Sequence, residues 1–197
     1  MTWTVLQKLG LADYATLAEY VEAERKRYVS GFVAARDALS QQATAPAAEV
    51  LISINTDTIK YPYRYLRVDL LTKDPSGNPR PIKLEDQPKK GKSRTYNLGS
   101  YVVEAHPFVW CSVKLRFNAR TLDIVRLEEW MTEKLDVKDE TPAGPKKERL
   151  AAHSFAPIQQ QGEWCELEAD LGTAPSATLI ELIGILGAQG ATQFVLA

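Results

Sequence analysis

The sequence predicts an α+β protein, and three patterns carry that prediction. Residues 13–41 bring apolar side chains onto one stripe at steps of three, four and seven, which is typical of one long helix. Residues 109–117 and 165–171 alternate between apolar and polar side chains, as half-buried strands do. A helical pattern with a plausible N-terminal cap follows each of these two strands, so strands and helices are interleaved in the C-terminal half.

The helix predicted over residues 13–41 has two possible uses. Its stripe can pack against the rest of the same chain, or it can pair with a second copy or a partner helix. Glu24 interrupts the stripe, so the pattern is not that of a strong zipper. Residues 41–48 are small and polar and contain a proline, which predicts a connector that ends a first segment, 1–48. The members of the stripe are Tyr14, Leu17, Val21, Tyr28, Phe32, Ala35 and Leu39.

The middle segment, residues 49–106, is predicted to be rich in β-hairpins. Strands are expected over 50–55 and 63–71, and a short return strand over 82–84 after the turn at 73–79. Residues 85–94 read as a polar loop, and 96–103 as extended chain. We expect this segment to form one compact unit with the residues that follow it.

Residues 107–197 have the element order of a ferredoxin-like βαββαβ sandwich. Strand 109–117 leads through a cap at Thr121 to a helix ending near Leu135, and a strand over 151–158 follows a charged loop. Strand 165–171 then leads through a cap at Thr173 to a second helix and a last strand at 193–197. In this fold the first and third strands are central and both helices cover one face. Cys111 and Cys165 are expected on the inward side of these strands, as reduced core thiols.

Composition and motifs exclude several functions. The net charge is −1, and no apolar stretch approaches the roughly 20 residues that cross a bilayer, so we expect a cytoplasmic protein. No zinc spacing, Gly-rich phosphate loop or GxSxG motif occurs, which predicts a non-enzymatic protein without metal or cofactor. The alternative, an uncharacterised hydrolase, would need His106 or His153 beside a carboxylate or thiol in a pocket.

The outward-facing residues of the two central strands predict a protein-binding surface, because tryptophan is enriched at interaction hot spots. In a ferredoxin-like sheet they would share the face that the helices leave open. An alternative is that residues 49–103 pack over this face. The predicted contact residues are Trp110, Lys114, Arg116, Trp164, Glu166, Glu168 and Asp170.

A second candidate surface is the basic middle of the chain. Residues 60–94 contain ten lysines and arginines against four carboxylates, a net charge of +6, and tyrosines alternate with basic residues there. Cations and aromatic rings on one surface can bind single-stranded nucleic acid through phosphate contacts and stacking. The aromatic pattern of an RNA-recognition motif is missing from the two central strands. The residues predicted for this alternative are Tyr61, Tyr63, Arg64, Tyr65, Arg67, Lys89, Lys90, Lys92 and Arg94.

The C-terminal residues 167–195 resemble a known ending. The run LEADLGTAPSATLIELI followed by GATQFV is similar to the strand, GxAP turn, helix and strand of small bacterial immunity-like proteins of polymorphic toxin systems. Proline at a helix start and glycine at its end account for much of this likeness. The resemblance implies a bacterial protein that binds another protein, and it assigns no residue a role.

Overall fold

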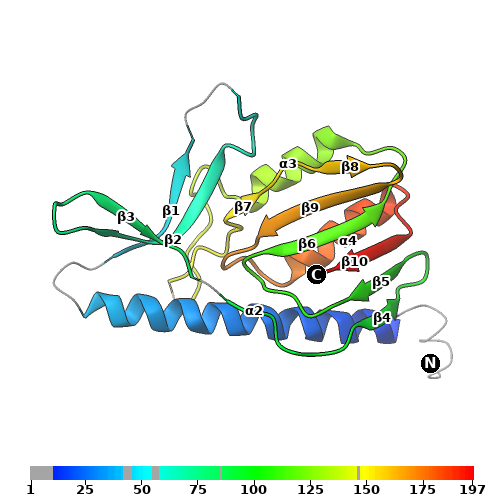
Figure 1. Cartoon of the computed structure of the whole chain (residues 1–197), viewed down its shortest axis with the longest axis horizontal. Helices are drawn as coiled ribbons and strands as arrows, with labels where there is room; N and C mark the ends of the chain where they lie inside the picture. The colour runs from blue at the N-terminus through cyan, green and yellow to red at the C-terminus, as the bar shows by residue number, and fades with distance from the viewer. Residues whose placement is uncertain (1–10, 42–45, 55–57, 85, 146) are drawn as a thin grey trace.

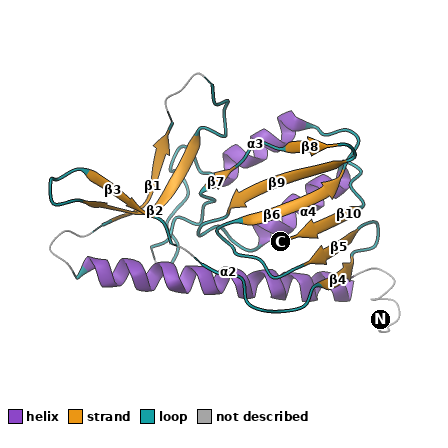
Figure 2. Ribbon diagram, viewed as in Figure 1, coloured by secondary structure: helices purple, strands orange, loops and turns teal. Residues whose placement is uncertain are grey.

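The computed structural model describes residues 11–41, 46–54, 58–84, 86–145 and 147–197, and their fold is α+β (Figure 1). Helices and two β-sheets are interleaved along the chain (Figure 2). The elements are α2 (Leu11–Ser40), β1 (Ala47–Ser53), β2 (Tyr65–Lys73), β3 (Pro79–Ile82), β4 (Arg94–Asn97), β5 (Val102–Ala105), β6 (Val113–Asn118), α3 (Ile124–Lys134), β7 (Ser154–Phe155), β8 (Gln159–Gln161), β9 (Trp164–Asp170), α4 (Ala177–Ala188) and β10 (Gln193–Leu196).

The larger sheet has the strand order β4-β5-β10-β6-β9-β7, and β8 also pairs with β9. β6 lies between β10 and β9 and is antiparallel to both, and β7 is antiparallel to β9. β5 joins the other side of β10 as its parallel neighbour, and β4 completes that side as an antiparallel hairpin strand. The chain before residue 107 therefore extends the sheet that the C-terminal part forms.

Helices α3 and α4 lie on one face of the larger sheet (Figure 1). The strand residues that face them are apolar and buried, among them Leu115 and Phe117 on β6 and Leu167 on β9. The residues between them point to the opposite face and, apart from the buried Asp170 at the end of β9, are exposed or half-buried. This alternation is the one predicted for strands with a single buried side.

Helix α2 packs with its apolar stripe in the protein's own core. Leu17, Val21, Tyr28 and Phe32 are buried in the same hydrophobic cluster as the residues of β6, β9 and α4. Burial of these side chains stabilises the fold by roughly 1.5–3 kcal/mol each. The prediction that the stripe packs against its own chain is therefore confirmed.

The smaller sheet has the order β1-β2-β3, with both pairs antiparallel. Val50 pairs with Val68 and Ala48 with Leu70, so Glu49 lies opposite Asp69 between them. β3 is the strand Pro79–Ile82, which starts earlier than the return strand predicted at 82–84. The sheet stands beside the larger one, above the C-terminal half of α2 in the view of Figure 1.

Several local predictions need correction. β6 begins at Val113 rather than 109, because residues 109–112 form a turn with a bridge between Val109 and Ser112. Cys111 is therefore buried but is not on a strand, whereas Cys165 is buried on β9 as predicted. Asp123, not Thr121, caps α3, and its carboxylate accepts a hydrogen bond from the Arg126 amide.

Two further predictions in the C-terminal part are only partly correct. The strand predicted over 151–158 is reduced to the two residues of β7, and β8 occupies 159–161, where a turn was expected at 160–162. α4 starts after Ser176, and the hydroxyl of Thr173 hydrogen-bonds to Glu49 instead of capping the helix. Side-chain contacts with the smaller sheet thus replace the predicted cap.

Candidate functional site

The face of the larger sheet opposite α3 and α4 carries the predicted protein-binding residues of β6 and β9. We call it the open face and define it by Lys114, Arg116, Trp164, Glu166 and Glu168. Cross-strand pairing sets Lys114 beside Glu168 and Arg116 beside Glu166. The Arg116 guanidinium also lies over the Trp164 ring, 5.5 Å from its centroid. A half-buried tryptophan among paired, exposed charges is thus the centre of this surface.

Two predicted members do not lie on the open face. Trp110 is fully buried, and its indole nitrogen donates to the Gly172 carbonyl at 2.8 Å. Trp110 does not follow the alternation that the sequence predicts, because the chain turns at residues 109–112 before β6 begins. Asp170 is also buried, because the smaller sheet and residues 150–153 pack around the end of β9. The middle segment therefore covers one end of this face and leaves the rest open.

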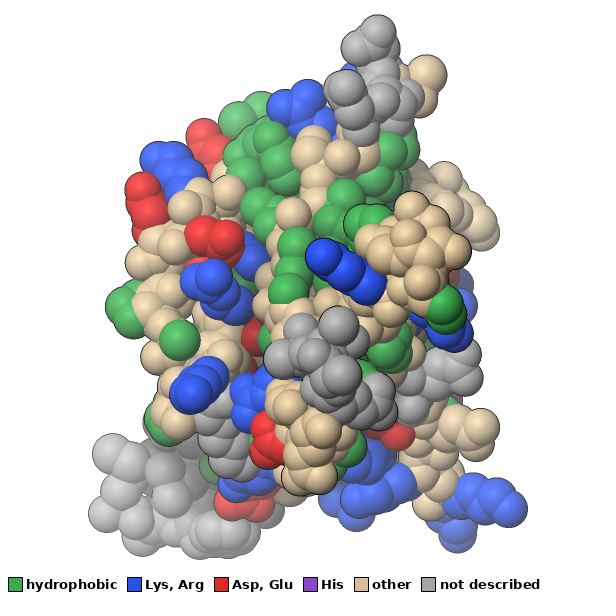
Figure 3. Space-filling view, turned by 90° about the vertical axis from the view of Figure 1, so that its left-hand side faces the viewer, with side chains coloured by type: hydrophobic (Ala, Val, Ile, Leu, Met, Phe, Trp, Pro, Cys, Tyr) green, Lys and Arg blue, Asp and Glu red, His purple; other side chains and the backbone are tan. Residues whose placement is uncertain are grey.

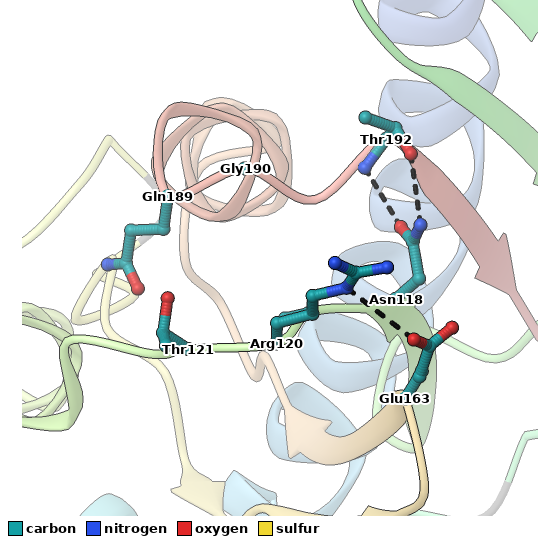
Figure 4. A pocket seen from close by; sticks show the side chains of 8 residues that line it. Asn118, Arg120, Thr121, Glu163, Gln189, Gly190 and Thr192 are labelled. Carbon is teal, nitrogen blue, oxygen red and sulfur yellow. Dashed lines mark hydrogen bonds and ion pairs between the residues drawn. The ribbon is translucent and has the colours of Figure 1, made fainter.

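A polar pocket of about 370 Å³ opens at the other end of the same strands (Figure 4). The side chain of Asn118 bridges β6 to the start of β10, accepting from the Thr192 amide at 2.8 Å and donating to its hydroxyl at 2.9 Å. Arg120 lies 3.5 Å from Glu163, and the side-chain oxygen of Gln189, Oε1, accepts a hydrogen bond from the Asp123 backbone amide. Of these side chains, only Gln189 has a buried polar atom, Nε2, without a hydrogen-bond partner among the described residues. Anchoring of the strands therefore explains most of the polar groups at this pocket.

The predicted nucleic-acid residues fall into separate places. Arg64 lies over the rings of Tyr61 and Tyr65, at 5.9 and 5.2 Å from their centroids. These two tyrosines line a pocket of about 750 Å³ whose other wall includes Glu129 and Glu133, carboxylates that repel phosphate. The Tyr63 hydroxyl meets Glu128, and burial and this carboxylate raise the pKa of Tyr63 to about 12.

The four remaining basic residues lie on the segment that leads into β4, on the other side of α2 in Figure 1. They are Lys89, Lys90, Lys92 and Arg94, and we call this group the basic loop. With Tyr20 and Glu24 of α2 they line a pocket of about 280 Å³. Arg94 lies over the Tyr20 ring, and among the described residues the three lysines have no carboxylate within 4.0 Å. Glu24 lines the same pocket and is the carboxylate that Lys89 influences. The basic loop, rather than the tyrosine cluster, is therefore the better candidate for a cationic surface.

Arg67, the last predicted nucleic-acid residue, is a structural cation of the interior. Its side chain is 0% exposed, because the register of β1 and β2 points it away from solvent. The guanidinium donates to the carbonyl oxygens of Leu135, Asp136 and Glu49 at 3.1, 2.6 and 3.0 Å. It also contacts the Asp139 carboxylate at 2.5 Å. Arg67 thereby ties the end of α3 to the smaller sheet, and it cannot meet a nucleic acid.

Sequence reasoning missed the most unusual cluster, which surrounds His153. The imidazole is 1% exposed, with Nε2 3.1 Å from Glu49 and Nδ1 3.3 Å from Asp69. Asp170 lies 3.8 Å from the same Nδ1. The ring packs against Gly172, where an added Cβ would lie 2.1 Å from it and where φ is +47°, so only glycine fits. We call His153, Glu49, Asp69 and Asp170 the buried charge cluster.

Each carboxylate of the buried charge cluster has further donors. Glu49 accepts from the Thr173 hydroxyl at 2.5 Å and the Arg149 amide at 2.7 Å. Asp69 accepts from the Tyr28 hydroxyl of α2 and, at 2.7 Å, from the Leu84 amide. The cluster thus joins α2, the smaller sheet and the C-terminal part through groups that are far apart in sequence.

The electrostatics of the cluster favour an imidazolium. Burial alone would lower the pKa of His153, but the close carboxylates of Asp69, Glu49 and Asp170 raise it to about 9. Burial would raise the pKa of Asp69, yet His153, Tyr28 and Leu84 outweigh it and lower that pKa. Burial dominates at Asp170 and raises its pKa.

The hydrolase alternative predicted a histidine beside a carboxylate or thiol in a pocket. His153 meets carboxylates in the interior, and His106 lies 3.0 Å from Glu104 at the surface. Neither histidine lines any of the pockets described above. Burial raises the pKa of the Cys111 thiol to about 11, which disfavours a reactive thiolate. Within the described ranges, no group of three or more histidine, cysteine, aspartate or glutamate side chains is arranged so that it could hold a metal ion.

Comparison of the chain with protein-family models, with curated proteins and with solved structures gave no match. No helix in the described part of the chain is long and apolar enough to cross a membrane.

Proposed function

We propose that the chain is a non-enzymatic protein-binding protein that uses the open face, in the manner of an immunity-like or assembly component. One observation carries this proposal: in the part of the chain that the structure describes, the larger sheet has helices on one face only, and its other face displays Trp164 among exposed charges of both signs. Tryptophan and arginine are the side chains most enriched at binding hot spots. The stacked pair Arg116 and Trp164 is the natural anchor for a partner.

We further propose that residues 107–197 are a ferredoxin-like unit, with 1–48 and 49–106 as segments added to it. The order β10-β6-β9-β7, with every neighbouring pair antiparallel, supports this arrangement. In that fold the sheet face without helices is available for binding, which agrees with the proposed use of the open face.

Replacing Trp164 with alanine and reversing the charges of Glu166 and Glu168 to lysine should strongly weaken capture of the partner. The expected loss is roughly tenfold or more in affinity, because hot-spot anchors carry most of the binding energy. The tagged protein would be used to capture proteins from its native host, and the retained protein would be titrated against each variant.

The matched control reverses Glu129 and Glu133 on α3 to lysine, which changes the same charge on the helical side. A partner retained equally by the open-face variant and by wild type would rule out this surface. If the open-face variant and the α3 control variant both lost affinity for the partner, the cause would be a general effect of charge, which would also count against the open face.

A second candidate function is nucleic-acid binding through the basic loop. The observation that favours it is the group of lysines around one pocket, none of which has a carboxylate within 4.0 Å among the described residues, although Glu24 lines the same pocket. Such lysines can neutralise phosphates and release counterions.

Changing Lys89, Lys90 and Lys92 to glutamine should weaken binding of a labelled single-stranded oligonucleotide about tenfold at low salt and flatten its salt dependence. Fluorescence anisotropy at several salt concentrations measures both quantities. The control changes Lys26 and Lys138, two exposed lysines elsewhere. Binding that is absent, or that does not respond to salt, would rule this function out.

A further inference from the structure

The basic loop concentrates positive charge on a short stretch of chain. Residues 87–95 contain Lys89, Lys90, Lys92 and Arg94 and no aspartate or glutamate. All four basic residues are exposed, and all four line one pocket. In the upper part of Figure 3, by contrast, lysine and arginine side chains lie beside carboxylates or hydrophobic side chains. An anion at the basic loop would therefore meet several cations at once.

One carboxylate, that of Glu24, lines the same pocket. Glu24 is only 4% exposed, and its carboxylate contacts the guanidinium of Arg27 on the same helix. Arg27 in turn lies 2.9 Å from Asp86. The carboxylate that lines the pocket thus has a cation of its own, and the four cations of the basic loop outnumber it. The pocket therefore keeps a net positive charge.

The ring of Tyr20, the one aromatic residue among the described residues that line this pocket, is already held by its neighbours. The Arg94 guanidinium lies over the ring, 5.8 Å from its centroid. The ring also packs against Phe108, with centroids 5.7 Å apart and planes at 82°. The Tyr20 hydroxyl donates to the His106 carbonyl oxygen at 3.1 Å. These contacts make the ring a poor platform for stacking a base.

The tyrosines that the sequence placed beside these cations do not share their surface. Tyr61 and Tyr65 line the pocket that also contains Glu129 and Glu133, on the other side of α2 from the basic loop. A nucleotide whose base stacked on these two rings would bring its phosphate toward carboxylates, which repel it. The structure therefore separates the aromatic rings from the cations that were expected to act with them.

We propose that the basic loop binds the phosphate backbone of a nucleic acid without contacting its bases. This inference rests on the second candidate function and names the chemical group that the same site recognises. The pocket volume of about 280 Å³ agrees with it, because pockets that enclose a drug-sized ligand measure roughly 300–1,000 Å³. A pocket below that range suits a phosphate group better than a whole nucleotide.

Three single-stranded probes of equal length separate phosphates from bases. The first is an ordinary oligonucleotide, the second has the same backbone with every base removed, and the third carries bases on an uncharged methylphosphonate backbone. Fluorescence anisotropy at low salt should show the abasic probe binding within about fivefold of the ordinary one, because losing even one stacked base would weaken binding by roughly that factor. The uncharged probe should bind at least roughly tenfold more weakly than the ordinary one.

Strandedness gives a second comparison. Duplex DNA carries one charge per roughly 1.7 Å of its axis, against roughly 3.4 Å for each of its strands. A site that contacts phosphates alone should therefore bind a duplex at least as tightly as a single strand. A site that stacks bases should prefer the single strand, whose bases are accessible.

Changing Lys89, Lys90 and Lys92 to glutamine should weaken the ordinary and the abasic probe by the same factor, roughly tenfold. The slope of log affinity against log salt should become shallower by about 2 for single strands, since each lost phosphate contact removes about 0.7. The matched control, which changes Lys26 and Lys138, should bind both probes as wild type does.

The outcomes distinguish this inference from the function on which it rests. If the ordinary probe binds through the three lysines but the abasic probe binds more than about fivefold more weakly, bases are contacted and only this inference fails. A single strand preferred more than about fivefold over a duplex, or an uncharged probe bound as tightly as the ordinary one, would overturn it in the same way. If neither charged probe binds, or if the lysine variant binds both as wild type does, the second candidate function fails as well.

Discussion

Replacing His153 with glutamine is expected to lower the free energy of unfolding, and to lower it by about 3 kcal/mol more at about pH 6 than at about pH 10. At the lower pH the imidazolium compensates Glu49 and Asp69, which are themselves buried. Glutamine keeps a hydrogen-bonding group of similar length but supplies no charge. The variant therefore leaves two carboxylates in the interior without their cation, which is strongly destabilising.

The direction of the pH dependence follows from the raised pKa of His153. Its value is about 9 in the folded chain, above the ordinary value of 6.5. A base with a raised folded pKa stabilises fully below its unfolded pKa and loses that contribution as pH rises through the folded pKa. Wild type should thus lose stability between about pH 6.5 and just above pH 9, and His153→Gln should show a flatter curve in that window.

Urea denaturation followed by tryptophan fluorescence measures this effect, since Trp110 and Trp130 are buried and report unfolding. His106→Gln is the matched control, because this histidine lies at the surface beside Glu104. The control should keep the slope of wild type. Parallel curves for wild type and His153→Gln across the window would show that the imidazole does not carry the compensating charge.

Much of the fold could be predicted because most elements have one apolar side. The spacing of Leu17, Val21 and Phe32 identified α2, and the alternation of Leu115 with Arg116 identified β6. The spacing of apolar residues along a helix or strand indicates which of its sides is buried, and this spacing can be read from a short stretch of sequence. The error at 109–112 arose where the same alternation continues through a turn, since periodicity does not record where pairing begins.

The buried charge cluster could not be predicted, because its members come from distant segments and no motif spacing links them. A signal was present in the strands: Glu49, Arg67 and Asp69 alternate with aliphatic residues, which indicates a sheet with one charged side. Charged residues are almost always exposed, so that side is expected to face solvent. The structure reverses the sides because His153 and the carbonyl oxygens at the end of α3 supply partners for these charges.

Replacing Arg67 with methionine is expected to lower the free energy of unfolding by about 3–5 kcal/mol, the usual cost of removing one member of a buried ionic network. Methionine fills a similar volume but leaves the carbonyl oxygens of Glu49, Leu135 and Asp136 without their donor. Because Leu135 is the C-terminal cap residue of α3, the end of this helix should loosen first. Urea denaturation and amide hydrogen exchange at the end of α3 measure the two effects.

Arg64→Met is the matched control for this prediction, since Arg64 is only half-buried and stacks on Tyr61 and Tyr65 at the surface. It should cost no more than about 1 kcal/mol. Arg67→Lys should recover part of the loss, because an ammonium keeps the charge but cannot reproduce the planar fork that reaches several oxygens at once. If the Arg64 and Arg67 replacements lower the free energy of unfolding equally, the buried guanidinium stabilises the protein no more than an arginine stacked at the surface does. The smaller sheet would then be held to α3 by packing alone. If the guanidinium network holds it, stability should instead rise from Arg67→Met through Arg67→Lys to wild type.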